Sequence, residues 1–305
     1  MHIISLLAAT ELFIKARDHW SGTLIVCFQP AKEKGAGAQA MVDDGLYLKV
    51  PVPDVVLGGH VMAFRSGFIG TKRGLMASAA DSFQLTLHGR GGHASMPHRS
   101  RDPILTAAHT ITRLQTIVAR ETDPADSAVV TVAAIHAGDA ENVIPAHADL
   151  KLNVRTWTPQ TRKRVLTSVR RIVDTEALAG EAPKPPELVP TSSFPFLVND
   201  DEVTAKLEVS FAAHFQSGSH GYDSNSRGLG GSEDFGVLAT AVNRPSSYWL
   251  FGGTDPGLWD MAEAEGTLEE IIPINHSPYF APVIQPTLRV AMDAYAVAAL
   301  TWLIK

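Results

Sequence analysis

The segment Ser82–His88 has the sequence SFQLTLH, in which apolar and polar side chains alternate as they do in a strand buried on one face. Upstream of it, Thr23–Gln29 (TLIVCFQ) and Asp54–Val61 (DVVLGGHV) are nearly continuous apolar runs, which are typical of buried parallel strands. A small-residue helix is predicted between them at Gly35–Leu46. The sequence therefore indicates an α/β domain that gives way to a different domain near Ser82.

Downstream of Ser82 the predicted elements follow the order strand, helix, strand, strand, helix. The helices are expected at Asp102–Glu121 and Pro159–Ala179, and the further strands at Ser127–Ala137 and Ala148–Trp157. This order fits a ferredoxin-like α+β sandwich. The proline-rich segment Lys184–Pro190 is either the last strand of that sandwich or the linker that leaves it.

An α/β pattern returns from about Thr191. The elements expected there are a helix at Glu202–Phe215, a strand at Ser246–Gly253 and a closing helix at Pro286–Ile304. We therefore predict a discontinuous α/β domain with a parallel or mixed sheet, formed by residues 1–77 and 191–305. A ferredoxin-like domain for dimerisation is expected as an insert at residues 78–190.

The composition excludes several classes of protein. The net charge of −6 gives no basic surface for nucleic acid, and no apolar stretch approaches the ~20 residues of a membrane span. The single cysteine, Cys27, excludes an internal disulfide and fits a reducing compartment. We therefore expect a cytoplasmic protein with neither nucleic acid nor membrane as a partner.

The first residues form an apolar segment, Met1–Ala9, which lacks the basic region of a secretory signal. It continues into a helical pattern, so a buried helix is favoured. The chain opens inside this helix without a cap or a preceding strand. We expect the first units of the α/β domain to be missing from the chain.

Three potential metal ligands lie at predicted strand ends or in loops. Glu33 follows the first strand, His60 ends the second, and His276 lies in a loop before the closing helix. Histidines and carboxylates bind metals such as zinc, and open α/β sheets form their sites at the carboxyl ends of strands. Each histidine alone is more readily explained as a satisfied core or surface residue, and the convergence of three candidates makes a site an equal alternative to that explanation.

Two motifs in the predicted insert carry further polar side chains. His93 lies in Arg90–His98 (RGGHASMPH) and Asn142 in Glu141–Pro145 (ENVIP). Both could hold a carbonyl oxygen or an oxyanion, although ordinary turns also use such residues. Arg155 could bind a carboxylate with two hydrogen bonds, but taken alone it suggests a solvent-facing strand arginine.

Six strings then occur in one order along the chain. They are FQPAKEKGAGAQAMVDDGL (Phe28–Leu46), GGHASMP (Gly91–Pro97), ENVIP (Glu141–Pro145), GGSEDFG (Gly230–Gly236), FGGTDP (Phe251–Pro256) and NHSPYF (Asn275–Phe280). In this order the chain resembles the amidohydrolase branch of the aminoacylase and carboxypeptidase-G2-like metallopeptidases, peptidase family M20, which includes hippurate hydrolases and auxin-conjugate hydrolases. The resemblance implies divalent metal, zinc or manganese, a small N-acyl amino acid or related amide as substrate, and a homodimer formed through the insert.

The resemblance also assigns roles to individual residues. The implied metal ligands are Glu33, His60 and His276, and the implied substrate-binding residues are His93, Asn142 and Arg155. His93 and Asn142 would also take part in catalysis, often across a dimer interface. The string at Ser232–Asp234 matches a Ser-Glu-Asp motif with a structural role.

Two departures from the family pattern bear on activity. The general-base position, normally a glutamate, is Lys32, and a protonated lysine has no lone pair to accept a proton from water. Met1 and His2 align with the last two positions of a Cys-Gly-His-Asp-x-His motif, so a cysteine and a histidine ligand are expected to be absent. We therefore expect weak, single or no metal occupancy.

These departures leave three interpretations open. The chain is an N-acyl amino acid amidohydrolase in truncated form, or a family member with non-hydrolytic chemistry such as condensation or acyl transfer. In the second case Lys32 would act as an acid or nucleophile. The third interpretation is a catalytically inactive pseudoenzyme that binds a ligand or partner.

Overall fold

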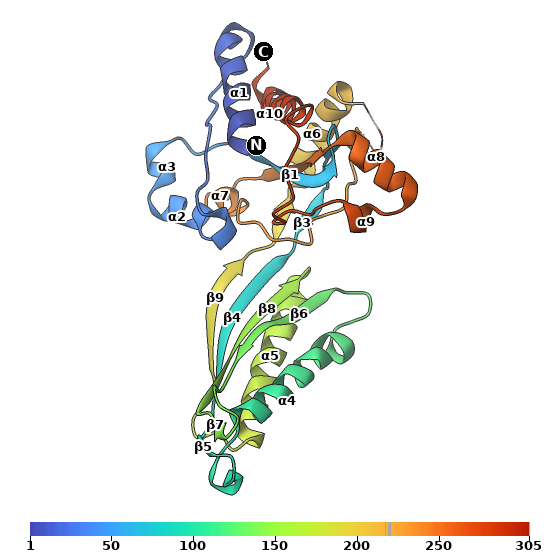
Figure 1. The fold of residues 1–305 in the computed structure, drawn as a ribbon. Helices are drawn as coiled ribbons and strands as arrows, with labels where there is room; N and C mark the ends of the chain where they lie inside the picture. The colour runs from blue at the N-terminus through green and yellow to red at the C-terminus, as the bar shows by residue number, and fades with distance from the viewer. Residues whose placement is uncertain (217, 219–220, 305) are drawn as a thin grey trace. The chain divides into compact units, whose positions relative to one another are not determined.

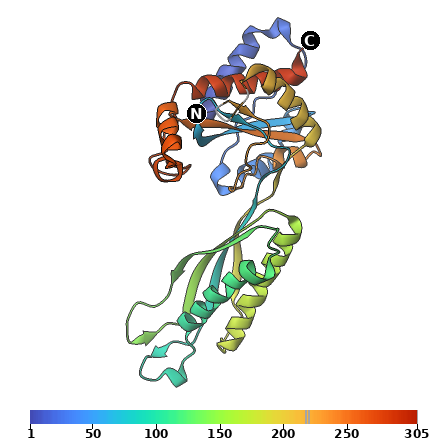
Figure 2. The ribbon, with the colours of Figure 1, turned by 90° about the vertical axis from the view of Figure 1, so that its right-hand side faces the viewer.

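The computed structural model describes residues 1–216, 218 and 221–304 (Figures 1 and 2). They form two compact units. We call residues 1–76, 197–229 and 234–305 the split unit, and residues 77–196 with 230–233 the insert unit. The mixed α/β composition with an inserted α+β unit confirms the predicted fold class.

The insert unit is a four-stranded antiparallel sheet in the order β6-β8-β4-β9. Its strands are β4 (Ala79–His88), β6 (Ala128–His136), β8 (His147–Thr156) and β9 (Glu187–Phe194). Its helices are α4 (Pro103–Thr116), which continues as a π-helical turn at Ile117–Glu121, and α5 (Pro159–Ala179). Both helices lie along one face of the sheet (Figure 1). The order β4-α4-β6-β8-α5-β9 is that of a ferredoxin-like fold.

Local sequence signals explain the insert unit. Asp102 accepts hydrogen bonds from the first N–H groups of α4, and Thr158 does the same for α5; a proline follows each cap. The alternation along β4 and β8 directs Leu85 and Leu150 into a core where both are fully buried. Two amphipathic helices cover the apolar face of the sheet, and this packing completes the core of the insert unit.

The split unit is built on two long parallel strands, β1 (Val56–Arg65) and β12 (Ser246–Thr254). The short strands β2 (Ile69–Gly70) and β11 (Tyr222–Asp223) extend the sheet beside β12, and β3 (Gly74–Ala77) pairs with β10 (Leu197–Asn199). Trp249 and Phe251 of β12 are fully buried among residues of the helices α6 and α10. The sheet is therefore mixed, and its core lies around β12.

Ten helices and four short 3-10 or π turns are assigned in the described residues, including those of the insert. The helices of the split unit are α1 (His2–Lys15), α2 (Gly37–Asp43), α3 (Leu46–Lys49), α6 (Asp201–His214), α7 (Val237–Thr240), α8 (Pro256–Glu265), α9 (Leu268–Ile271) and α10 (Thr287–Leu303). The 3-10 turns are η1 (Arg17–His19), η2 (Lys32–Lys34) and η3 (Pro97–Arg99), the last in the insert. No helix in the described part of the chain is long and apolar enough to cross a membrane.

Two predicted elements of the split unit are wrong. Thr23–Gln29 is not a strand, because no strand of the described residues lies beside it to complete its backbone hydrogen bonds; its side chains are half-buried or exposed. The helix predicted at Gly35–Leu46 is divided into α2 and α3, because Gly45 adopts the left-handed conformation (φ 77°) and ends the first helix.

The unit boundary also differs from the prediction. The segment after Lys184 is the last strand of the insert, and β9 continues to Phe194, opposite Ala80 of β4. The main segment of the insert therefore runs from 77 to 196 instead of 78 to 190. Residues 230–233 join it because the Ser78 hydroxyl donates to the carbonyl oxygens of Gly230 and Gly231.

Candidate active site

Lys32 lies at the centre of the candidate site in the split unit. It opens the turn η2 after Ala31, which has a left-handed backbone (φ 48°). The side chain of Lys32 is 27% exposed, and its Nζ lies 3.5 Å from Nε2 of His60 and 4.0 Å from Oε1 of Glu33. The ammonium therefore faces two of the three residues that the sequence proposes as metal ligands.

His60 is held by the backbone of its own strand. The prediction that His60 ends its strand is wrong, because the apolar pattern continues and β1 runs on to Arg65. Its Nδ1 lies 2.6 Å from the carbonyl oxygen of Val61, which can only accept, so Nδ1 donates and Nε2 keeps its lone pair. Burial, followed by the charges of His2 and Lys32, lowers the pKa of His60 to about 3, so the ring is neutral near pH 7.

His2 is a neighbour that the sequence interpretation did not count as part of the site. Its ring centroid lies 4.7 Å from that of His60, and its Nε2 accepts a hydrogen bond of 3.0 Å from the N–H of Val61. Burial lowers the pKa of His2 to about 4, with further contributions from the N-terminal ammonium and Lys32. Its place at the end of the aligned Cys-Gly-His-Asp-x-His motif was the signal that could have found it.

His276 approaches the same cluster from a loop. Its backbone is left-handed (φ 70°), and its Nε2 lies 3.6 Å from Oε2 of Glu33. The preceding Asn275 donates to the carbonyl oxygen of Val61 at 2.9 Å and accepts from the N–H of Ala63 at 3.2 Å. The Asn275 amide thus bonds to β1 as a neighbouring strand would, and it fixes the loop that carries His276.

The four side chains form a row in the order His60, Lys32, Glu33, His276. Within the described residues, no three His, Cys, Asp or Glu side chains gather as a metal-binding group. The Lys32 ammonium stands between the imidazole and the carboxylate that a shared ion would have to join. As arranged, these residues do not fit a divalent metal ion.

Asp234 fixes the segment that carries this row. It is buried; one of its carboxylate oxygens accepts from the Gln29 amide at 2.6 Å and the other from the Ala38 N–H at 3.0 Å. These two bonds bracket Lys32 and Glu33 in the sequence. The buried carboxylate therefore holds both ends of the loop between the extended segment and α2.

In the insert unit, His93 and Asn142 share a small two-stranded ribbon. His93 belongs to β5 (Gly92–His93), which pairs with β7 (Val143–Ile144), and the Ala94 N–H donates to the Asn142 carbonyl oxygen at 2.9 Å. Nδ1 of His93 accepts from the Ser95 N–H at 3.2 Å, which leaves the ring proton on Nε2 in the neutral form. Both side chains are exposed, and both can donate a hydrogen bond to an oxygen atom.

Arg155 is a half-buried residue of β8 in the same unit. Its Nη1 donates to the carbonyl oxygen of Gly230 at 3.2 Å and lies 3.4 Å from the hydroxyl of Ser232. The guanidinium is therefore not a bare solvent-facing group. It binds the 230–232 segment and presents its charge there.

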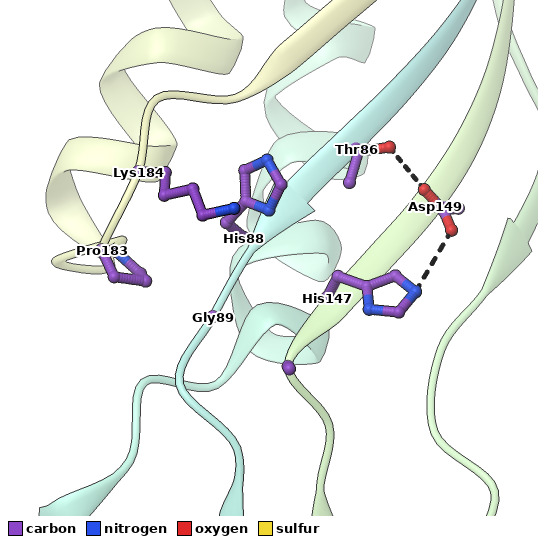
Figure 3. A pocket seen from close by; sticks show the side chains of 8 residues that line it. Thr86, His88, Gly89, His147, Asp149, Pro183 and Lys184 are labelled. Atoms are coloured by element: carbon purple, nitrogen blue, oxygen red, sulfur yellow. Dashed lines mark hydrogen bonds and ion pairs between the residues drawn. The ribbon is translucent and has the colours of Figure 1, made fainter.

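A separate pocket of about 470 Å³ lies where β4 ends and β8 begins in the insert unit (Figure 3). Asp149 accepts from the Thr86 hydroxyl and lies 3.5 Å from Nε2 of His147, as the dashed lines in Figure 3 mark. His88 pairs instead with Glu187 at 2.9 Å. The sequence interpretation did not identify this pocket, although Thr86 and His88 are two residues apart and therefore lie on the same face of β4.

Comparison with known proteins shows which protein family this chain resembles. The family model of the peptidase dimerisation domain, M20_dimer, matches residues 77–181, which form most of the insert unit. The hippurate hydrolase of Campylobacter jejuni is 37% identical over 241 residues, 78% of this chain and 60% of that protein. The N-acetyl-L-cysteine deacetylase of Bacillus subtilis is 35% identical over 287 residues, 92% of this chain and 64% of that protein.

Solved structures agree on the fold. A dinuclear metal-binding peptidase of the M20 family from Bacillus subtilis superposes with a TM-score of 0.69 at 24% identity, covering 97% of this chain and 69% of that one. A split α/β unit with a peptidase dimerisation insert is thus the fold that this chain shares with M20 peptidases. The chain belongs to the M20 family. It spans less than two thirds of the length of these two curated relatives.

Proposed function

We propose that this protein recognises N-acyl amino acids or related small amides at an amidohydrolase-type site, and that Lys32 prevents ordinary hydrolysis there. The relatives named as a hippurate hydrolase and an N-acetyl-L-cysteine deacetylase support this class of ligand. Both are named for the removal of an acyl group from an amino acid. For this chain we propose that a ligand of this class is bound but not hydrolysed.

The observation that carries the proposal is the position of the Lys32 ammonium, 3.5 Å from Nε2 of His60. An ammonium has no lone pair, so it cannot accept the proton of a water molecule that attacks an amide. Glu33 has the Lys32 ammonium near one carboxylate oxygen and the His276 ring near the other. The site therefore lacks the base that would generate a nucleophile.

Ligand recognition would use donors that the chain does retain. The Nε2–H of His93 and the side-chain amide of Asn142 can donate to the carbonyl oxygen of an amide. The Arg155 guanidinium can pair with the carboxylate of an amino acid. These residues are the substrate-binding set that the family resemblance implies.

The M20 relative from Bacillus subtilis binds two metal ions, and zinc or manganese is the metal implied for this chain. The residues around Lys32 do not fit such an ion as arranged. The recognition chemistry proposed here therefore uses only side chains of this chain.

A second candidate is covalent chemistry at Lys32. In its deprotonated form Lys32 Nζ is a nucleophilic amine; its proton would pass to solvent, because the low pKa of His60, about 3, makes that imidazole too weak a base to hold it. That amine would form an amide with an acyl donor, releasing the leaving group. Intact-mass analysis after incubation with hippurate distinguishes this candidate, because a benzoyl group would remain on Lys32.

The test combines binding and turnover. We expect hippurate and N-acetyl-L-cysteine to bind in calorimetry but to be hydrolysed neither with zinc nor with manganese. Arg155→Ala should weaken binding about tenfold, through loss of a charge-assisted hydrogen bond. Lys32→Glu should not restore turnover, because His60, Glu33 and His276 would supply at most one ion site, whereas the M20 relative from Bacillus subtilis binds two ions.

The matched control is Lys34→Glu, which makes the same change of charge at an exposed lysine of the same turn. Turnover by the unmodified chain that Lys32→Ala abolishes would show that Lys32 is catalytic. Absence of binding to either ligand would refute recognition.

We also infer a homodimer formed through the insert unit. The match to a peptidase dimerisation domain supports it, and so does the edge strand β6, whose Val129 and Ile135 are 41% and 45% exposed. Light scattering at micromolar concentration should give twice the chain mass. Val129→Lys with Ile135→Lys should give a monomer, and a monomeric unmodified chain would contradict the inference.

A further inference from the structure

The row of side chains around Lys32 contains a cation of its own. The ammonium of Lys32 lies between His60 Nε2 at 3.5 Å and Glu33 Oε1 at 4.0 Å. Its side chain is only 27% exposed, whereas that of Glu33 is 69% exposed. Lys32 therefore projects into the cluster and does not extend along the surface as an ordinary lysine would.

The neighbouring imidazole is oriented as a ligand would be. The Nδ1–H of His60 is bound to the Val61 carbonyl oxygen, an arrangement that commonly orients histidines bound to metals. The lone pair on Nε2 therefore faces away from the strand and toward the Lys32 ammonium. The atom that would coordinate an ion accepts from an N–H donor instead.

The carboxylate beside it is also engaged. Glu33 has Lys32 near one oxygen and His276 near the other, at 4.0 and 3.6 Å. A divalent ion entering between His60 and Glu33 would lie beside the fixed positive charge of Lys32. Like charges at such a separation repel strongly where water is partly excluded.

We propose that the Lys32 ammonium occupies the cation position of this cluster, so that the split unit excludes divalent metal ions for as long as Lys32 is present. His60 and Glu33, which do not gather around a metal ion, both lie beside the positive charge of the Lys32 ammonium. His60, Glu33 and His276 are retained as a lysine-binding cluster. Removing the ammonium should convert them into a single metal site.

The geometry allows this conversion. Zinc binds imidazole and carboxylate at about 2.0–2.2 Å, so its ligands must move closer together than the Lys32 contacts hold them. The side chains of Glu33 and His276 are 69% and 71% exposed and can turn without leaving a packed core. His60 is fixed by its strand, so the other two ligands would move toward it.

The experiment measures zinc alone, with no substrate. The unmodified protein, Lys32→Met and the control Lys34→Met are titrated with zinc by calorimetry, and the zinc retained after dialysis is counted by elemental analysis. Methionine keeps an unbranched side chain only one heavy atom shorter and removes the charge. We expect less than one zinc in ten chains for the unmodified protein and for Lys34→Met.

For Lys32→Met we expect one zinc per chain and an affinity at least 100-fold higher than that of the unmodified protein. Adding His60→Ala to Lys32→Met should abolish the gain, which assigns the zinc to this cluster. Tight zinc binding by the unmodified protein, or no gain in Lys32→Met with a native circular dichroism spectrum, would overturn the proposal. This readout uses no amide ligand, so failure of the proposed function leaves its outcome unaffected.

Discussion

The insert unit and the split unit satisfy their sheets in different ways. In the insert, β4 and β8 pair along their whole lengths, and two capped helices cover one face. In the split unit, β1 and β12 form the one long pairing among the described strands. There, side chains replace missing ladder bonds. Asn275 donates to the Val61 carbonyl oxygen and accepts from the Ala63 N–H along one edge of β1, and Asn199 donates to the Tyr248 carbonyl oxygen and accepts from its N–H.

This difference predicts where each unit is vulnerable. The stability of the insert is spread over a continuous apolar core, so it depends on packing volume. The split unit depends more on individual buried amides and carboxylates, where the loss of one group leaves backbone partners unsatisfied.

The largest effect is expected for Leu150→Ala in the insert. Leu150 is fully buried at the centre of β8, and truncation leaves a cavity that should lower the free energy of unfolding by about 3 kcal/mol. Urea denaturation followed by circular dichroism measures it. The control Leu178→Ala, at a side chain that is 79% exposed, should change stability by less than about 0.5 kcal/mol.

A smaller and more local effect is expected for Asn199→Ala in the split unit. This buried amide also donates to the Lys72 carbonyl oxygen, so its loss leaves several backbone groups unpaired and should cost about 2 kcal/mol. Hydrogen exchange should increase at β12 and leave β4 and β8 protected. Uniform exchange across both units would contradict the separation drawn here, and Asn225→Ala, at an exposed residue, is the matched control.

The smallest effect is expected for Phe28→Ser. Phe28 is 44% exposed in the extended segment that was predicted to be a buried strand, so the change should cost less than about 0.5 kcal/mol. Phe13→Ser, at a phenylalanine that is 5% exposed, should cost several times more. A loss above about 2 kcal/mol for Phe28→Ser would show that the segment is buried after all.

The sequence predicted the insert well because its signals are local. The proline at the first turn supported the prediction of α5 at about Pro159–Ala179, and the structure gives these bounds. Thr23–Gln29 could not be judged in this way, because an apolar run forms a strand only where neighbours complete its hydrogen bonds. Periodicity within one segment does not contain that information.

For the candidate site, the sequence identified residue types but not their arrangement. Their places at predicted strand ends and in a loop, together with the family resemblance, selected Glu33, His60 and His276, and the structure places all three in one row. A lysine beside a carboxylate that lacks its metal is expected to pair with that carboxylate, and Lys32 Nζ does lie 4.0 Å from Glu33 Oε1. Its approach to His60 could not be predicted, because that neighbour is distant in the chain. The assignment of Glu33, His60 and His276 as metal ligands remains a prediction, which the zinc titration tests.

The segment Gly230–Glu233 matters to anyone who wishes to transplant the insert as a module. It belongs to the insert through Ser78 and Arg155, yet it is separated from residues 77–196 by a stretch of the split unit. A graft cut at 77 and 196 would leave it behind and expose the strand ends that it covers. A portable version needs this tetrapeptide supplied again, as a fused loop or a short synthetic peptide.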